Sequence, residues 1–260
     1  MPRRILHYVP ILLVLIGASA RAASWGDLTG HFVYDGTPPT PKALVITKDP
    51  EICGKHNLVD ETLKVGAKGE LADMIIFLRT PAKPAVHPDY EKTASDKVPL
   101  DNRNCQFIPH VQLVRTTQKL AISNSDPTGH NTNIESFNNA FNQTIPSNEP
   151  VITQCAKEEK FPVKVTCNVH PWMKGVLLIR SNPYMAASKE TGEFTIANLP
   201  AGTELEFVLW HETCGYVKGA GVKGLKVDSR GRFKMTLKPG KNDLGEIRIP
   251  GNNLKGRLSQ

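Results

Sequence analysis

The sequence predicts an all-β protein, and three observations support that fold class. Short runs rich in Val, Ile, Phe and Thr alternate with Gly, Pro, Asn and Asp, which is typical of strands separated by turns. The chain contains 20 glycines and 20 prolines, which suit turns and edge strands better than helices. No stretch keeps a helical spacing of apolar residues with capping signals for more than about two turns. We therefore expect β-sandwiches.

Residues 1–22 have the organisation of an export signal, and we exclude them from the predicted fold. Arg3 and Arg4 form a basic start, an apolar run covers 9–16, and the segment ending at Ala22 has the small-x-small pattern of a cleavage site. The apolar run is too short to span a bilayer, which needs about 20 residues, and no later stretch is apolar enough. We expect cleavage near Ala22 and a periplasmic or secreted protein. A retained membrane anchor is the alternative.

Candidate strands recur along the rest of the chain. Runs of β-branched and aromatic residues bounded by turn residues predict strands at 31–34, 43–47, 74–78, 163–166, 176–179 and 206–210. A Lys- and Pro-rich stretch at 81–96 predicts an exposed loop. We divide the mature chain into an N-terminal β region at 23–98, a central domain at 99–181, a C-terminal β-sandwich at 182–250 and a frayed polar tail at 251–260.

Charge and motif content argue against several function classes. The formal net charge is +7, and removal of Arg3, Arg4 and Arg21 with the signal leaves about +4. No basic stripe with interleaved aromatic residues is present, which argues against nucleic-acid binding. Mild basicity fits an acidic partner or solubility equally well. No Ser-His-Asp arrangement, catalytic carboxylate pair or phosphate-binding glycine loop stands out, so we expect a protein that is not an enzyme.

The most informative segment is 167–173, Cys-Asn-Val-His-Pro-Trp-Met. It places Cys167, His170 and Met173 at successive steps of three residues, and another candidate ligand, His130, lies upstream. One thiolate, two imidazoles and a thioether are the ligand set of a trigonal copper site with a long, weak axial bond. Such a geometry suits both oxidation states of copper, so little has to move when an electron arrives.

The surroundings of these residues resemble the cupredoxins, the family of blue copper proteins. Residues 163–179 are similar to the cupredoxin C-terminal ligand loop between two strands, with the C-x2-H-x2-M spacing of amicyanin. Residues 120–131 resemble the strand that delivers the first histidine. The resemblance implies a Greek-key β-sandwich over 99–181 and a type 1 copper protein that carries single electrons. It also implies one copper ion, cycling between Cu(I) and Cu(II), with four ligands: His130, Cys167, His170 and Met173.

The resemblance also implies where a redox partner docks. In the family the edge of the C-terminal histidine is exposed within an apolar patch, and Pro171 and Trp172 flank His170 here. We expect a redox partner protein to dock near His170 and Trp172; alternatively, Trp172 packs into the sandwich. Asn131, directly after His130, is a candidate for a hydrogen bond that ties the two ligand loops together.

Five cysteines in an exported chain predict structural disulfides. If Cys167 is a ligand, four others allow three pairings, and the sequence does not choose among them: Cys53, Cys105, Cys155 and Cys214. We favour Cys53 with Cys105 because both lie in the N-terminal half. A Cys155–Cys167 disulfide is an alternative, as is a zinc site, which would need further thiolate or imidazole ligands.

A second metal site is conceivable near Cys53, His56, Cys105 and His110. We favour a Cys53–Cys105 disulfide with two solvated histidines there. A two-copper centre would need a second cysteine in the ligand loop, and Val163 stands at the corresponding position.

Residues 189–202 carry the pattern G-x-F-x-I-x-x-L-P-x-G and resemble carboxypeptidase-regulatory-like β-sandwich domains. Residues 28–36 resemble the opening strand of the same domain type. One hypothesis is a single sandwich of this type, split by an inserted cupredoxin. The segment 210–212 is either a surface turn or a contact with the copper domain. The alternatives to an electron carrier are a copper-binding protein without redox turnover and a structural β-sandwich module.

Overall fold

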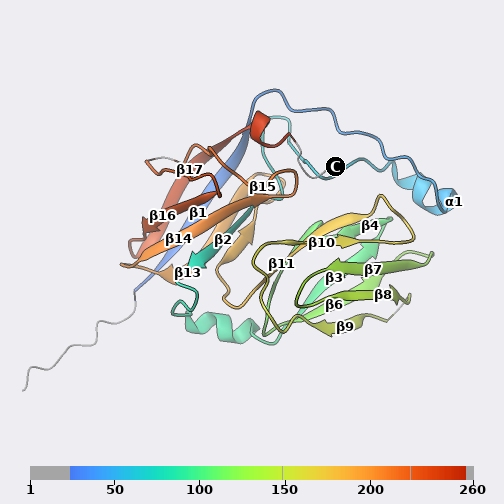
Figure 1. Cartoon of the computed structure of the whole chain (residues 1–260), viewed down its shortest axis with the longest axis horizontal. Coiled ribbons are helices and arrows are strands. Elements are labelled where there is room, and N and C mark those ends of the chain that lie inside the picture. Colours follow the sequence, from blue (N-terminus) through green and yellow to red (C-terminus); the bar gives the residue numbers. More distant parts are fainter. Residues whose placement is uncertain (1–23, 148, 223, 256–260) are drawn as a thin grey trace, which may run out of the picture.

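The structure is a computed structural model that describes residues 24–147, 149–222 and 224–255 (Figure 1). The all-β prediction is confirmed, because the described residues form 17 strands and one four-residue α-helix, α1 (Pro50–Cys53), with three short 3-10 segments. The predicted export signal at 1–22 lies outside the described residues. Within the described ranges, no helix is long and apolar enough to cross a membrane.

Residues 97–180 form a two-layered sandwich, here called the ligand sandwich because all four predicted ligands belong to it. One sheet has the order β5 (Val111–Arg115), β11 (Lys174–Arg180), β10 (Val163–Thr166), β7 (His130–Glu135) and β8 (Phe141–Ile145). The other has the order β4 (Gln106–Ile108), β3 (Lys97–Arg103), β6 (Lys119–Asn124) and β9 (Val151–Gln154). Apolar side chains from both sheets, such as Phe107 and Leu177, are buried between them.

A second sandwich, here called the split sandwich, uses strands from both ends of the chain. Its first sheet has the order β13 (Glu193–Pro200), β1 (Trp25–Asp35) and β17 (Gly240–Pro250). Its second has the order β12 (Met185–Ala187), β2 (Ile75–Thr80), β14 (Glu204–His211) and β15 (Gly215–Tyr216), with β16 (Arg232–Thr236) paired to β14. The ligand sandwich is therefore inserted between β2 and β12.

The two sandwiches pack against each other through β11. This strand is buried along nearly its whole length, because one face covers the ligand sandwich core and the other meets the split sandwich. Strands covered on both faces read as continuous apolar runs, as 176–179 does. Val176 and Leu178 pack with Phe77 of β2 and Trp210 of β14. Beside this apolar contact, Glu212 reaches His110 of the ligand sandwich, so segment 210–212 is a contact between the sandwiches.

A long connection at 36–60, here called the strap, leaves β1 and crosses to the ligand sandwich, where it carries α1 (Figure 1). The predicted strand at 43–47 is wrong: only Ala43 makes an isolated bridge, to Val59. The alternation of apolar residues has another cause, since Leu44 packs on the ligand sandwich core while Val45 is 79% exposed.

Two other parts of the chain are more ordered than the sequence indicated. The loop at 81–96 contains a 3-10 helix, η2 (Pro88–Thr93), whose Tyr90 carbonyl accepts a hydrogen bond from Arg115. The tail is not frayed where it begins, because a 3-10 turn, η3 (Gly251–Asn253), places Leu254 in the core of the split sandwich.

Candidate metal centre

The four predicted ligands come from two neighbouring strand ends of one sheet. His130 is the first residue of β7, and Cys167 directly follows β10. Strands β7 and β10 are antiparallel neighbours, which brings the start of one beside the end of the other. His170 and Met173 lie in the loop that leads from β10 into β11. The local fold therefore gathers residues separated by 43 positions in the chain.

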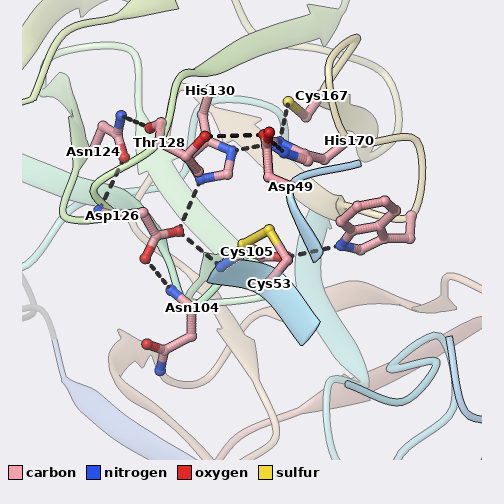
Figure 2. Close-up of a disulfide and its surroundings, with 11 residues drawn as sticks. Asp49, Cys53, Asn104, Cys105, Asn124, Asp126, Thr128, His130, Cys167 and His170 are labelled. Carbon is pink, nitrogen blue, oxygen red and sulfur yellow. Dashed lines mark hydrogen bonds and ion pairs between the residues drawn. A yellow bond between two sulfur atoms is a disulfide. The ribbon is translucent and has the colours of Figure 1, made fainter. Parts of the chain in front are cut away.

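Three of these side chains converge on one point. The Nδ1 atoms of His130 and His170 are 2.9 Å apart, and the Cys167 Sγ lies 3.9 Å from the His170 Nδ1 (Figure 2). All three donor atoms lie within 4.8 Å of one another. Metal–nitrogen bonds of about 2.0 Å and metal–sulfur bonds of about 2.3 Å place such atoms roughly 3–4 Å apart around a shared first-row ion. Both histidines are fully buried and Cys167 is 3% exposed.

Met173 is held in the same turn by backbone hydrogen bonds. Its N–H donates to the His170 carbonyl at 2.9 Å, and its carbonyl accepts from the Cys167 N–H at 3.3 Å. The Met173 side chain is 1% exposed and belongs to the core of the ligand sandwich. Next to it, half-buried Trp172 packs on that core, with its ring centroid 5.1 Å from that of His170 and its Nε1 donating to the Cys105 carbonyl at 3.3 Å.

A carboxylate stands behind each histidine. Asp126 Oδ2 lies 2.8 Å from the Nε2 of His130, and Asp49 Oδ2 lies 2.8 Å from the Nε2 of His170 (Figure 2). An ionised carboxylate only accepts hydrogen bonds, so both Nε2 atoms carry hydrogen and the two Nδ1 atoms face inward. This is the arrangement in which outer partners fix the orientation of metal-binding imidazoles.

The buried groups shift one another's pKa values in different directions. Burial lowers the pKa of His130, but hydrogen bonds to Asp126 and Cys167 outweigh it and raise that pKa to about 9. Burial raises the pKa of Cys167, but hydrogen bonds from His130 and nearby backbone N–H groups outweigh it, so the net shift is downward and favours the thiolate. Burial lowers the pKa of His170, and Asp49 only partly offsets it. A cation between these donors would replace a proton.

Asn131 links the two ligand-bearing segments, as predicted. Its Oδ1 accepts a hydrogen bond from the Asn168 backbone N–H at 2.6 Å, and its Nδ2 donates to Asn142 of β8 at 2.6 Å. The loop after Cys167 is therefore tied to β7 and β8.

The cysteine chemistry removes several alternatives. Cys53 and Cys105 form a disulfide, which confirms that prediction. Cys155 and Cys167 are both free, so the alternative of a disulfide between them is wrong. Because Cys53 and Cys105 are both oxidised, the second metal site considered around them loses both of its thiolates. His56 is exposed, but the expectation that His110 is solvated is wrong, because His110 is 7% exposed and its Nε2 lies 2.6 Å from Glu212 Oε2.

The donor set fits copper. A compact group of one thiolate and two imidazoles matches the strong donors that copper takes in a trigonal site, and the loop that carries two of them also carries the buried Met173. A structural zinc site would be closed by a fourth strong ligand. Among the described residues, no fourth His, Cys, Asp or Glu completes the group of His130, Cys167 and His170 within 4.8 Å.

No family model and no curated protein matches this sequence. Several solved structures resemble part of the fold. They include a copper-containing nitrite reductase from Thermus scotoductus SA-01, with 17% identity and a TM-score of 0.30 over 32% of this chain and 22% of that one. A purple cupredoxin from Nitrosopumilus maritimus is 17% identical, with a TM-score of 0.28, over 32% of this chain and 99% of that one. A reduced Cu(I) form of an amicyanin mutant is 13% identical, with a TM-score of 0.30, over 40% of this chain and 98% of that one. Similarity of this extent does not assign the chain to a family.

Neither carboxylate was predicted from the sequence. Asp126 could have been found, because it lies four residues before His130 in the segment that carries the first ligand. No sequence pattern pointed to Asp49, since it lies 121 residues from His170 and on a different part of the fold.

Proposed function

We propose that this protein is an exported type 1 copper protein that carries single electrons. The observation that supports the proposal most strongly is the convergence of Cys167 Sγ with the Nδ1 atoms of His130 and His170. In the proposed site these three groups, together with Met173, would hold one copper ion. Bound copper would supply one-electron chemistry between Cu(I) and Cu(II).

The protein's own groups contribute rigidity and exclusion of water. The two imidazoles are each held by a carboxylate, and the Cys167–His170 loop is tied to β7 by Asn131. Because these contacts restrict movement, we expect little rearrangement between oxidation states. The full burial of His130 and His170 leaves no exposed ligand edge for a substrate, which favours a carrier over an enzyme.

The disulfide supports an exported location. Structural disulfides persist mainly in oxidising compartments, and the Cys53–Cys105 disulfide is buried beside the proposed copper site. We therefore keep the periplasmic or secreted location as part of the proposal.

The proposed docking of a redox partner near His170 and Trp172 takes a more specific form. His170 itself is covered, whereas Val169 is 39% exposed and Pro171 is exposed. We propose that the partner contacts Val169 and Pro171 and that the electron passes through the ligand loop beneath them.

Copper loading with a cysteine series tests the proposed site. The purified chain without its first 22 residues is titrated with cupric ion, and we expect one equivalent and an intense thiolate-to-copper charge-transfer band. Cys167→Ala abolishes the band, while Cys155→Ala and Cys214→Ala, which remove the other free thiols, keep it. A colourless complex in the wild type, or a band that survives Cys167→Ala, contradicts the proposal. Absence of stoichiometric uptake leaves the structural-module alternative.

A copper-binding protein without redox turnover is the second candidate, and the complete burial of His170 favours it. The rate of electron self-exchange distinguishes the two candidate functions. It is measured on the copper-loaded protein by NMR line broadening in mixtures of the Cu(I) and Cu(II) forms. Fast exchange supports the carrier, and a blue protein with very slow exchange supports the second candidate.

A further inference from the structure

The strap brings a carboxylate to the proposed copper site from outside the ligand sandwich. Asp49 is the N-cap residue of α1 and has a left-handed backbone conformation, with φ 46° and ψ 52°. Its Oδ2 faces the Nε2 of His170 at 2.8 Å and accepts a hydrogen bond from the Thr128 hydroxyl at 3.0 Å. Thr128 lies two residues before His130, so one carboxylate contacts both ligand-bearing segments (Figure 2).

The disulfide fixes the position of this carboxylate. Cys53 lies four residues after Asp49, and its N–H donates to the Asp49 carbonyl at 2.9 Å. On the other side of the disulfide, the Cys105 N–H donates to Asp126 Oδ2 at 2.8 Å, and Asp126 faces His130. The Cys53–Cys105 disulfide therefore lies between the two carboxylates and holds the strap to the segment that positions the second one.

The contact between Asp49 and His170 determines which ring nitrogen of His170 is free to bind a metal. A neutral imidazole has one N–H and one lone pair, and the carboxylate of Asp49 requires the hydrogen on Nε2. The lone pair is then on Nδ1, which faces His130 and Cys167. The same contact covers the histidine edge that the cupredoxin resemblance implies is exposed, and His170 is fully buried.

We propose that Asp49 is a positioning residue for the copper centre: from the disulfide-anchored strap it holds His170 with Nδ1 toward copper and closes the His170 edge to solvent. The inference rests on the proposed function, because it takes His170 as a copper ligand. The strap thus forms part of the metal centre although it lies outside the sandwich that carries the ligands.

Three variants test this role in the copper-loaded protein. Asp49→Ala removes the hydrogen-bond acceptor of His170, and Asp49→Asn keeps an acceptor without its charge. The control is Glu51→Ala, which removes an exposed carboxylate two residues away. The Glu51 side chain makes no hydrogen bond or ion pair with any residue that the structure describes. We expect Asp49→Ala to speed the transfer of Cu(I) to a chelator by about 10–100-fold, the usual cost of losing an outer partner of a metal-binding histidine. Asp49→Asn should stay within a few-fold of the wild type. Both Asp49 variants should have a raised reduction potential, since a nearby negative charge favours Cu(II).

Glu51→Ala should match the wild type in release rate and potential. Circular dichroism of each variant confirms that it folds, and Asp49→Asn keeps the test valid if Asp49→Ala does not fold. The proposal would be overturned if both Asp49 variants had the same copper release rate and the same reduction potential as Glu51→Ala.

A measurement without copper separates this inference from the proposed function. Nitrogen-15 NMR of the copper-free chain reports which ring nitrogen of His170 carries hydrogen. We expect the hydrogen on Nε2 in the wild type and in Glu51→Ala, and a mixture of tautomers in Asp49→Ala. An unchanged His170 signal in Asp49→Ala overturns the positioning role, whereas a wild type that forms no blue centre overturns the proposed function and leaves Asp49 only as the residue that orients His170.

Discussion

The two sandwiches differ in what lies at their centres. The split sandwich buries an apolar core that includes the fully buried rings of Phe32 and Phe207. The ligand sandwich also buries polar side chains at its ligand end, among them Asn102, Asn124 and Asp126. Buried polar networks are costly unless their members find partners, but they specify one arrangement. Both sandwiches have apolar cores with some buried polar side chains, and the ligand sandwich adds a hydrogen-bonded polar cluster and a disulfide at its ligand end.

The largest effect on stability is expected when a buried ring is removed from the core of the split sandwich. Phe207→Ala removes a fully buried ring that stacks on Phe233, and we expect a loss of about 3–5 kcal/mol in the free energy of unfolding. Urea denaturation followed by circular dichroism measures the loss. The copper charge-transfer band of the folded variant should be unchanged. A shifted band would show that the two sandwiches are coupled more tightly than their separate cores indicate.

Removal of the disulfide should destabilise the ligand sandwich. The Cys53–Cys105 disulfide closes a segment of 52 residues, so we expect the double variant Cys53→Ala/Cys105→Ala to lose about 2–4 kcal/mol. Unlike Phe207→Ala, it should also speed copper loss, because the strap is no longer anchored. Cys214→Ala, in the split sandwich, is the control for thiol removal. Copper release at the wild-type rate from the double variant would mean that the strap holds its position without the disulfide.

The contact between the sandwiches should depend on pH. Burial is the largest single influence and lowers the pKa of His110, but the hydrogen bond to Glu212 and the negative charges of Glu212, Asp73 and Glu61 together outweigh it, so the net shift is upward. A raised pKa stabilises the fold fully below the unfolded value of about 6.5, and this stability is lost as pH rises through the folded value. We expect Glu212→Gln to cost about 1–3 kcal/mol at low pH and less at high pH. Urea denaturation across a pH series measures this, and a pH-independent difference would contradict it.

The smallest effect is expected at the link between the ligand loops. Asn131→Ala removes the acceptor of the Asn168 N–H, and we expect a loss of about 1 kcal/mol. Because the loop after Cys167 becomes less restrained, the electron paramagnetic resonance signal of the Cu(II) form should broaden. An unchanged signal would show that the β-strands alone fix the ligand loop.

The sequence was sufficient for features that depend on local pattern. The all-β class followed from turn residues and short apolar runs, and the segment around Cys167 and His170 carried its own strand-loop-strand context. The disulfide prediction depended only on which half of the chain each cysteine occupies.

Features that depend on distant contacts could not be predicted. Asp49 reaches His170 only because the strap crosses to the ligand sandwich, and nothing near position 49 specifies that path. The apolar alternation at 43–47 predicted a strand, because a segment lying flat on another domain also buries one face. His110 was expected in solvent because its cover, Glu212, belongs to the other sandwich.

The pairing of β1 with β17 has a consequence for the order of assembly. Gly26 pairs with Gly240 and Asp35 with Pro250, so a chain made from its N-terminus keeps β1 without this neighbour until residues 240–250 have been synthesised. An unpaired strand edge is an aggregation hazard during that wait. The ligand sandwich ends at Arg180 and, once folded, holds the ends of β2 and β12 near each other, which shortens the effective loop that the split sandwich must close. The inserted sandwich would thus act as an internal folding aid for the domain that surrounds it.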